Sequence, residues 1–263
     1  MTTKTYRTAA VDEVLVRHES RIAVITINRP HAKNAVTRAA SEGIAAALDE
    51  LDRRDDSYVG VLTGAGGSFC TGMDLKGFLR GERPSIEGRG FAGLTEAPPK
   101  KPLIAAVEGY ALAGGCEIVL ACDLVVAART AKFGIPEVRR GLVAAAGGLM
   151  RLPHRVPAQI AMELALTGDM ITAERAYEVG LVNRLTEEGD ALEAALALAG
   201  TIAANGPLAT LASKRVIKEH EQWPETDRFS RQRQIIDPVF ASEDAQEGAR
   251  AFAEKRRPNW RGR

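Results

Sequence analysis

The sequence of 263 residues predicts an α/β fold with a helical C-terminal region. Short runs rich in β-branched residues alternate with helical segments as far as about residue 146, and from Gly147 onward the pattern is almost entirely helical. Strands that alternate with helices indicate right-handed β-crossover-β units. We therefore expect residues 1–200 to form the core that carries the chemistry, and residues 201–263 to form a separate helical region.

The first expected elements are a hairpin and a helix. Residues 14–16 and 22–27 are rich in Val and Ile, and polar residues separate the two runs, which is typical of paired strands. Thr37 is placed to cap a helix that ends near Arg54, because apolar residues recur between them at helical spacing.

The middle of the chain continues the alternation. Residues 58–63, 102–107 and 124–128 are expected to form buried strands, and residues 116–121 a short helix. Residues 81–101 are rich in Gly, Pro and charge, so we expect a mobile surface segment there.

Three later helices have clear start signals. Thr172 and Ser242 are good cap residues, and Pro207 suits the first position of a helix. A long helical array needs a surface to pack on, so we expect part of this region to contact a neighbouring subunit.

The composition is that of an ordinary globular protein, with 45% hydrophobic and 26% charged residues. The net charge of +1 gives no reason to expect nucleic acid or an anionic membrane as a partner. The three cysteines show no metal-ligand spacing and fit a reducing compartment. Met1–Ala10 is polar, so we expect no secretory signal and a cytoplasmic protein.

The loop of residues 68–75 contains a turn that could bind an anion. Gly72 allows the backbone to turn sharply and to approach a ligand closely. Such a turn can present the N–H of Met73 to a negative charge. Taken alone, the same residues also suit an ordinary turn between a strand and a helix.

A second glycine turn, at Gly114 and Gly115, opens the short helix that carries Glu117. The free N–H groups and the positive dipole end of a helix N-terminus favour an anion. Glu117 could simply compensate that dipole at the surface. Its neighbours are apolar, however, and a carboxylate among buried apolar residues has a raised pKa that suits catalysis.

A second carboxylate follows at Glu137, where Pro136 restricts the path of the chain. Taken singly, this residue suits a solvated loop glutamate paired with Arg139 or Arg140. Two backbone-donor turns and two carboxylates together suit the addition of water to a double bond conjugated to a thioester. Two fixed N–H groups would stabilise the enolate, while one carboxylate takes a proton from water and the other gives one to the α-carbon.

These segments resemble the crotonase (enoyl-CoA hydratase/isomerase) superfamily. The similarity covers nearly the whole chain and is carried by five segments: NRPHAKNAV (28–36), VLTGAGGSFCTGMDLK (61–76), KPLIAAVEGYALAGGCEIVLACDLVVAARTAKFGIPEV (101–138), AYEVGLVNRL (176–185) and SEDAQEGARAFAEKR (242–256). The resemblance implies a β-β-α superhelix of the ClpP-like kind, with a C-terminal helical region that forms a homotrimer or a dimer of trimers.

The resemblance also assigns roles in catalysis. It implies oxyanion donors at the N–H of Met73 and of Gly114. Glu117 matches the family's water-activating glutamate, and Glu137 matches the glutamate that donates the α-proton in hydratases. Because both glutamates are present, hydration or dehydration is favoured, with no metal and no cofactor besides the coenzyme A (CoA) of the substrate.

The same resemblance implies a set of CoA contacts. They are the Ala32 backbone, the Thr71 carbonyl at the adenine, and Lys76 near the phosphates. Phe252 and Lys255 resemble the pair that reaches the CoA of a neighbouring subunit.

Among the positions that depart from the usual hydratase pattern, Met73 and Ala145 bear most on the site. Met73 stands where many hydratases have alanine, so we expect a narrowed or reshaped acyl pocket. Ala145 replaces a glycine of the loop that follows Glu137, which bears on how water is positioned.

The leading hypothesis is an enoyl-CoA hydratase that adds water reversibly, in syn geometry, to a trans-2-enoyl-CoA and gives a 3-hydroxyacyl-CoA. A carnitinyl-CoA-like dehydratase remains an alternative, because residues 242–263 are similar to that group. A Δ3-Δ2 enoyl-CoA isomerase and a non-catalytic relative that binds acyl-CoA or RNA also remain open.

Overall fold

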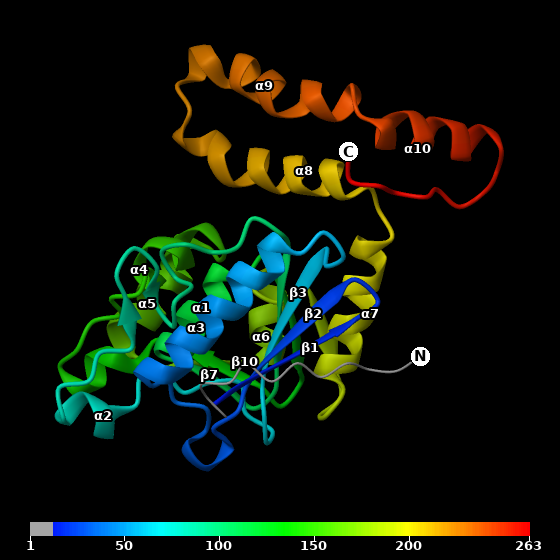
Figure 1. Cartoon of the computed structure of the whole chain (residues 1–263). Helices are drawn as coiled ribbons and strands as arrows, with labels where there is room; N and C mark the ends of the chain where they lie inside the picture. The colour runs from blue at the N-terminus through cyan, green and yellow to red at the C-terminus, as the bar shows by residue number, and fades with distance from the viewer. Residues whose placement is uncertain (1–12) are drawn as a thin grey trace.

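The computed structural model describes residues 13–263. The polar start of the chain, for which we expect no secretory signal, lies outside the described residues. Most of the core is built on one six-stranded sheet (Figure 1). Its strands, in spatial order, are β1 (Val14–Glu19), β2 (Ile22–Ile27), β3 (Val59–Gly64), β6 (Leu103–Val107), β8 (Leu124–Ala128) and β11 (Arg184–Thr186).

Strands β1 and β2 form the expected antiparallel hairpin, and every later pair in this sheet is parallel. Both faces of the sheet are covered. Alternate residues of β2 belong to different apolar clusters, with Ile25 on the side of α1 (Arg38–Arg53) and Val24 on the side of α7 (Ala191–Ala203). Burial on both faces is typical of parallel sheets and explains the continuous apolar runs in the sequence.

The helix α1 confirms the expected cap. The Thr37 side chain accepts a hydrogen bond from the N–H of Ala40, and the helix ends at Arg53. The other expected starts are also confirmed at α6 (Ala173–Glu178), α8 (Pro207–Glu219) and α10 (Glu243–Ala253).

A smaller sheet was not expected from the sequence. It joins β10 (Met170–Thr172), β9 (Lys132–Gly134) and β7 (Tyr110–Leu112). Each strand has three residues, too few for a clear period-2 pattern. This sheet matters for the site because β7 leads directly into the second glycine turn and β9 leads towards Glu137.

The prediction that residues 81–101 form a mobile surface segment is wrong for residues 90–95, which are buried. The segment contains a hairpin, β4 (Ser85–Ile86) and β5 (Gly90–Phe91). Phe91 and Leu94 belong to the main apolar cluster. The glycines and charges of this segment mask the few apolar residues that pack inward.

The remaining helices complete the molecule. Helices α3 (Gly114–Ala121), α4 (Gly148–Arg151) and α5 (Ala158–Thr167) belong to the same part of the molecule as the sheets. Helix α2 (Leu75–Leu79) follows the first glycine turn. Helices α8, α9 (Arg228–Phe240) and α10 form a separate layer above the core (Figure 1). The boundary near residue 200 between core and helical region is consistent with this layer and stays a prediction.

Short 3-10 helices connect several of these elements: η1 (Pro30–Ala32), η2 (Pro136–Arg140), η3 (Leu152–His154), η4 (His220–Gln222) and η5 (Glu225–Asp227). Within residues 13–263 no single helix has both the length and the apolar character needed to cross a membrane. Helix α7 and residues 207–222, bent by 107°, meet that test of length and composition only as a pair.

Candidate active site

The two glycine turns lie side by side. The N–H of Cys70 donates to the carbonyl of Tyr110 at 2.8 Å, and the N–H of Leu112 donates to the carbonyl of Cys70 at 3.0 Å. Gly72 has a φ of +94°, and a Cβ on this residue would lie only 3.0 Å from the backbone nitrogen of Gly114. Only glycine therefore lets the first turn approach the second this closely.

This approach brings two backbone donors together. Within residues 13–263, the N–H groups of Met73 and Gly114 donate no hydrogen bond to another part of the protein. Gly114 begins α3, where the helix dipole favours negative charge. Ala113, just before it, holds a φ of 52° and a ψ of −129°, a strained conformation for a residue other than glycine. The geometry suits an oxyanion.

Glu117 is buried in the first turn of α3, with 3% of its surface exposed. Its Oε1 accepts hydrogen bonds from the N–H of Ala146 at 2.7 Å and from the N–H of Gly148 at 2.8 Å. Burial raises the pKa of Glu117, while these two donors and the Arg151 charge oppose the rise. Because both donors bind Oε1, the other carboxylate oxygen is left for a ligand.

Glu137 lies in η2, directly after Pro136. Its Oε2 is buried and has no hydrogen-bond partner within the described part of the chain. Burial, with the nearby negative charge of Glu117, raises the pKa of Glu137 to about 7. Arg139 pairs with Asp169 instead of Glu137, whereas the charge of Arg140 lies near enough to Glu137 to oppose the rise of its pKa. A carboxyl group with this pKa can donate a proton near neutral pH.

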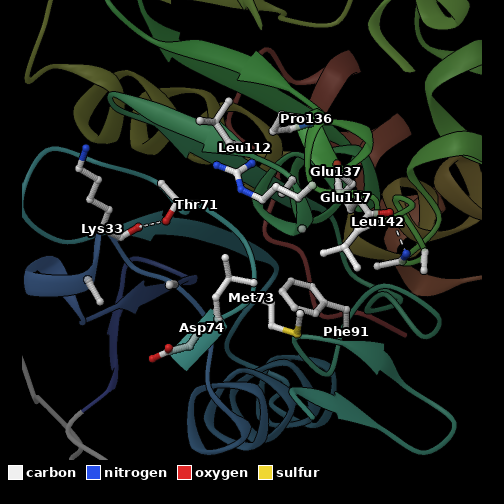
Figure 2. Close-up of a pocket in the computed structure, with 18 of the residues that line it drawn as sticks. Lys33, Thr71, Met73, Asp74, Phe91, Leu112, Glu117, Pro136, Glu137 and Leu142 are labelled. Atoms are coloured by element: carbon white, nitrogen blue, oxygen red, sulfur yellow. Dashed lines mark hydrogen bonds between the residues drawn. The ribbon is translucent and has the colours of Figure 1, made fainter. Parts of the chain in front are cut away.

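Both carboxylates and both glycine turns line one cavity of about 810 Å³. Figure 2 shows Glu117 and Glu137 next to each other in one wall, with Met73 and Phe91 across the cavity. The sulfur of Met73 points towards the Phe91 ring in this view. Met73 therefore lines the cavity, and a narrowed or reshaped acyl pocket stays a prediction.

The expected CoA contacts fall in two places. Ala32, Thr71 and Lys76 line the same cavity as the glutamates. Phe252 belongs to α10 and Lys255 follows that helix, and neither residue lines this cavity within one chain. Phe252 is 88% exposed, an unusual state for a phenylalanine in an isolated chain.

Sequence reasoning missed several residues that shape the site. Phe91 packs against Gly114, where an added Cβ would lie 2.6 Å from the ring. Asn34 ties two loops together, because its side-chain amide donates to the carbonyls of Ala65 and Ser68. Asn34 is buried and lies shortly after Asn28-Arg29-Pro30. That motif is the one sequence signal that could have pointed to Asn34.

Among residues 13–263, no group of three or more His, Cys, Asp or Glu side chains could hold a metal ion. Burial raises the pKa of the Cys70 thiol to about 12, so this cysteine is not an activated nucleophile. Ala145, the departure in the loop after Glu137, lines the cavity and precedes Ala146, whose N–H binds Glu117.

Comparison with known proteins agrees with this geometry. The family model described as enoyl-CoA hydratase/isomerase matches residues 17–263. The chain is 43% identical over 262 residues to the enoyl-CoA hydratase EchA19 of Mycobacterium tuberculosis, covering 95% of this chain and 97% of that protein. It is 40% identical over 252 residues to the carnitinyl-CoA dehydratase of Salmonella typhi, with coverage of 92% and 95%.

Solved structures show the same fold. A crystal structure of an enoyl-CoA hydratase from Mycobacterium tuberculosis H37Rv superposes with a TM-score of 0.94 at 63% identity and covers 95% of this chain and 99% of that one. The crotonase resemblance is thus confirmed over the sheet, the two glycine turns and the helical layer alike. On these matches, this chain belongs to the enoyl-CoA hydratase/isomerase family.

Proposed function

We propose that this protein is an enoyl-CoA hydratase, a hydro-lyase that reversibly adds water to a trans-2-enoyl-CoA and forms a 3-hydroxyacyl-CoA. One observation carries the proposal: a carboxylate held by two N–H donors and a second carboxyl with a pKa of about 7 line the same cavity as the two glycine turns. The names of the relatives support the same reaction class.

The backbone donors stabilise the charge that forms during the reaction. When water adds to C3 of the conjugated double bond, the electron pair moves through C2 onto the thioester oxygen. The N–H groups of Met73 and Gly114 bind that oxygen. Removal of one such donor typically lowers the rate by about 10²–10³.

The two glutamates move the protons. The free oxygen of Glu117 holds the water and takes its proton as the C3–O bond forms. Glu137 gives its proton to C2 as the enolate collapses. Its raised pKa keeps a useful fraction protonated near neutral pH, whereas the donors on Oε1 favour the ionised form of Glu117. Exchange with solvent then restores both groups.

The CoA part of the substrate lies along Ala32, Thr71 and Lys76, at the same cavity as the glutamates. Phe252 and Lys255 complete the site from a neighbouring subunit, in the homotrimer or dimer of trimers that the family resemblance implies. The exposed Phe252 supports this assembly. We propose no cofactor besides the CoA of the substrate. A cytoplasmic location, supported by three free cysteines, is part of the same proposal.

A steady-state assay tests the function. Purified protein is mixed with crotonyl-CoA, and the loss of absorbance of the conjugated thioester is followed. Glu117→Gln and Glu137→Gln should each lower kcat by about 10²–10⁴, because each removes one proton-transfer group. Glu163→Gln, an exposed residue on α5, serves as the matched control. Absence of turnover by the unmodified protein on short, medium and long enoyl chains would overturn the proposal.

Heavy-oxygen water separates hydration from Δ3-Δ2 isomerisation. Hydration places one labelled oxygen on the product, whereas isomerisation moves a proton within the acyl group and incorporates none. The same experiment run from a 3-hydroxyacyl-CoA follows dehydration, the reaction named for the carnitinyl-CoA relatives. An unlabelled product of the reaction from a 3-enoyl-CoA, with no hydration of crotonyl-CoA, would favour an isomerase.

A further inference from the structure

One arginine connects the loop that holds Glu117 to the segment behind the oxyanion donors. Arg151 ends α4, and its guanidinium donates to the carbonyl of Ala146 at 3.5 Å and to the carbonyl of Thr95 at 2.5 Å. Ala146 is also the residue whose N–H holds Oε1 of Glu117. The arginine therefore binds the carbonyl of the same residue whose N–H orients the carboxylate.

The loop is shaped around this side chain. Gly147 has a φ of +96°, and a Cβ on this residue would lie 2.2 Å from Nη1 of Arg151. Any larger residue at this position would displace the guanidinium. Gly148, the next residue, supplies the second donor to Glu117 and begins α4.

The second contact leads to the oxyanion site. Thr95 is buried, and its N–H donates to the carbonyl of Phe91 at 3.2 Å. The Phe91 ring in turn packs against Gly114, one of the two free backbone donors. Through these contacts Arg151 joins residues 144–148 to residues 91–95, two segments that are far apart in the sequence.

We propose that Arg151 is a positioning residue for hydration: its guanidinium fixes residues 144–148, and with them the orientation of the free Glu117 oxygen relative to the oxyanion donors. This inference rests on the proposed function. Arg151 itself does not line the cavity, so it acts through Glu117 and not on the substrate.

The charge of Arg151 also acts on Glu117 and lowers its pKa, against the rise that burial causes. Other charged or titratable groups face this pair from each neighbouring element. Glu137 lies next to Glu117 with Arg140 near it, Arg155 follows the end of η3, and Cys116 precedes Glu117 on α3. Only Arg151 supplies positive charge to Glu117 directly among these groups.

Three variants test the proposal. Arg151→Met should lower kcat for crotonyl-CoA by about 10- to 100-fold, the effect expected when a catalytic group is misplaced by about 1 Å, with KM nearly unchanged. Because the lost charge raises the pKa of Glu117, the acid limb of the kcat/KM profile should move to higher pH. Arg151→Lys should restore that limb but only part of kcat, since an ammonium cannot span both carbonyls.

Arg155→Met is the matched control. This neighbouring arginine donates to the carbonyls of Leu120, Cys122 and Asp123, so its loss should lower thermal stability and leave the acid limb in place. If Arg151→Met lowers stability but leaves the acid limb and kcat of the folded enzyme unchanged, the positioning role is refuted.

A measurement without turnover keeps this test separate from that of the proposed function. Carbon-13 NMR of carboxyl-labelled glutamates, with Glu117 assigned through Glu117→Gln, reports its pKa directly. The Arg151→Met protein should show a higher Glu117 pKa than the unmodified protein, even if crotonyl-CoA proves not to be a substrate. An unchanged pKa would overturn the proposal.

Discussion

The raised pKa of Glu137 predicts that Glu137→Gln stabilises the fold in a pH-dependent way. Burial raises this pKa from its ordinary value of 4.5 to about 7. The folded protein therefore binds the proton more tightly than the unfolded chain, and this stabilisation is present below pH 4.5 and is lost as the pH rises through about 7. At pH 8 the ionised, partly buried carboxylate opposes folding, and glutamine removes that opposition.

The size of the effect follows from the shift. The change in the pKa of Glu137 from 4.5 to about 7 corresponds to at most about 3.4 kcal/mol in the free energy of unfolding, at about 1.36 kcal/mol for each pKa unit. Glu137 is only half-buried, and solvent screening reduces the expected gain to about 1.5 kcal/mol. For a chain of this size, that gain corresponds to a rise in Tm of about 3–6 °C at pH 8, with little change at pH 4.5.

Thermal and denaturant unfolding at both pH values measures the gain, at one fixed protein concentration because assembly also affects stability. Glu163→Gln, on the exposed face of α5, is the matched control and should show no such difference between the two pH values. The reasoning fails if Glu137→Gln is equally stable relative to the unmodified protein at pH 4.5 and pH 8, or is less stable at pH 8.

Three further substitutions test the site. Met73→Ala opens the cavity beside Phe91. The ratio of kcat/KM for octenoyl-CoA to that for crotonyl-CoA should therefore rise about tenfold. An unchanged ratio would show that Met73 does not limit the length of the acyl chain. Gly72→Ala places a methyl group 3.0 Å from the nitrogen of Gly114. This change should lower kcat for crotonyl-CoA about 100-fold. Full activity of this variant would argue against an oxyanion site at the two turns. Ala113→Gly removes the strain of a positive φ at this residue and should raise the free energy of unfolding by about 1 kcal/mol, as measured by denaturant unfolding. A loss of stability would show that Ala113 is not strained.

Much of the fold was predictable because its main strands and helices are long and strongly patterned. The hairpin of β1 and β2, the capped helix α1 and the parallel strands β3, β6 and β8 all follow from apolar periodicity and cap residues. The three-residue strands of the smaller sheet carry no such period. Their pairing depends on contacts between segments that are distant in the sequence.

The dependence on contacts between distant segments also explains why sequence reasoning missed Arg151 and Phe91 at the site. Glu117, Glu137 and the two glycine turns stand in recognisable motifs, and the structure brings them to one cavity. Arg151 stands in no motif that was singled out, and its contact with Thr95 spans 56 residues of sequence. Phe91 was hidden in a segment whose glycines and charges suggested a surface loop. The roles of Arg151 and Phe91 depend on tertiary contacts, so the structure is needed to identify them.

The central claim is that Glu117 and Glu137 act on a thioester whose oxygen is bound by two backbone donors. A crystal structure of the protein with bound 3-hydroxybutyryl-CoA tests it most directly. The thioester oxygen should lie within about 3.1 Å of the nitrogens of Met73 and Gly114, with one glutamate at the C3 hydroxyl and the other beside C2. A thioester bound elsewhere, or one with its oxygen turned away from both nitrogens, would contradict the claim.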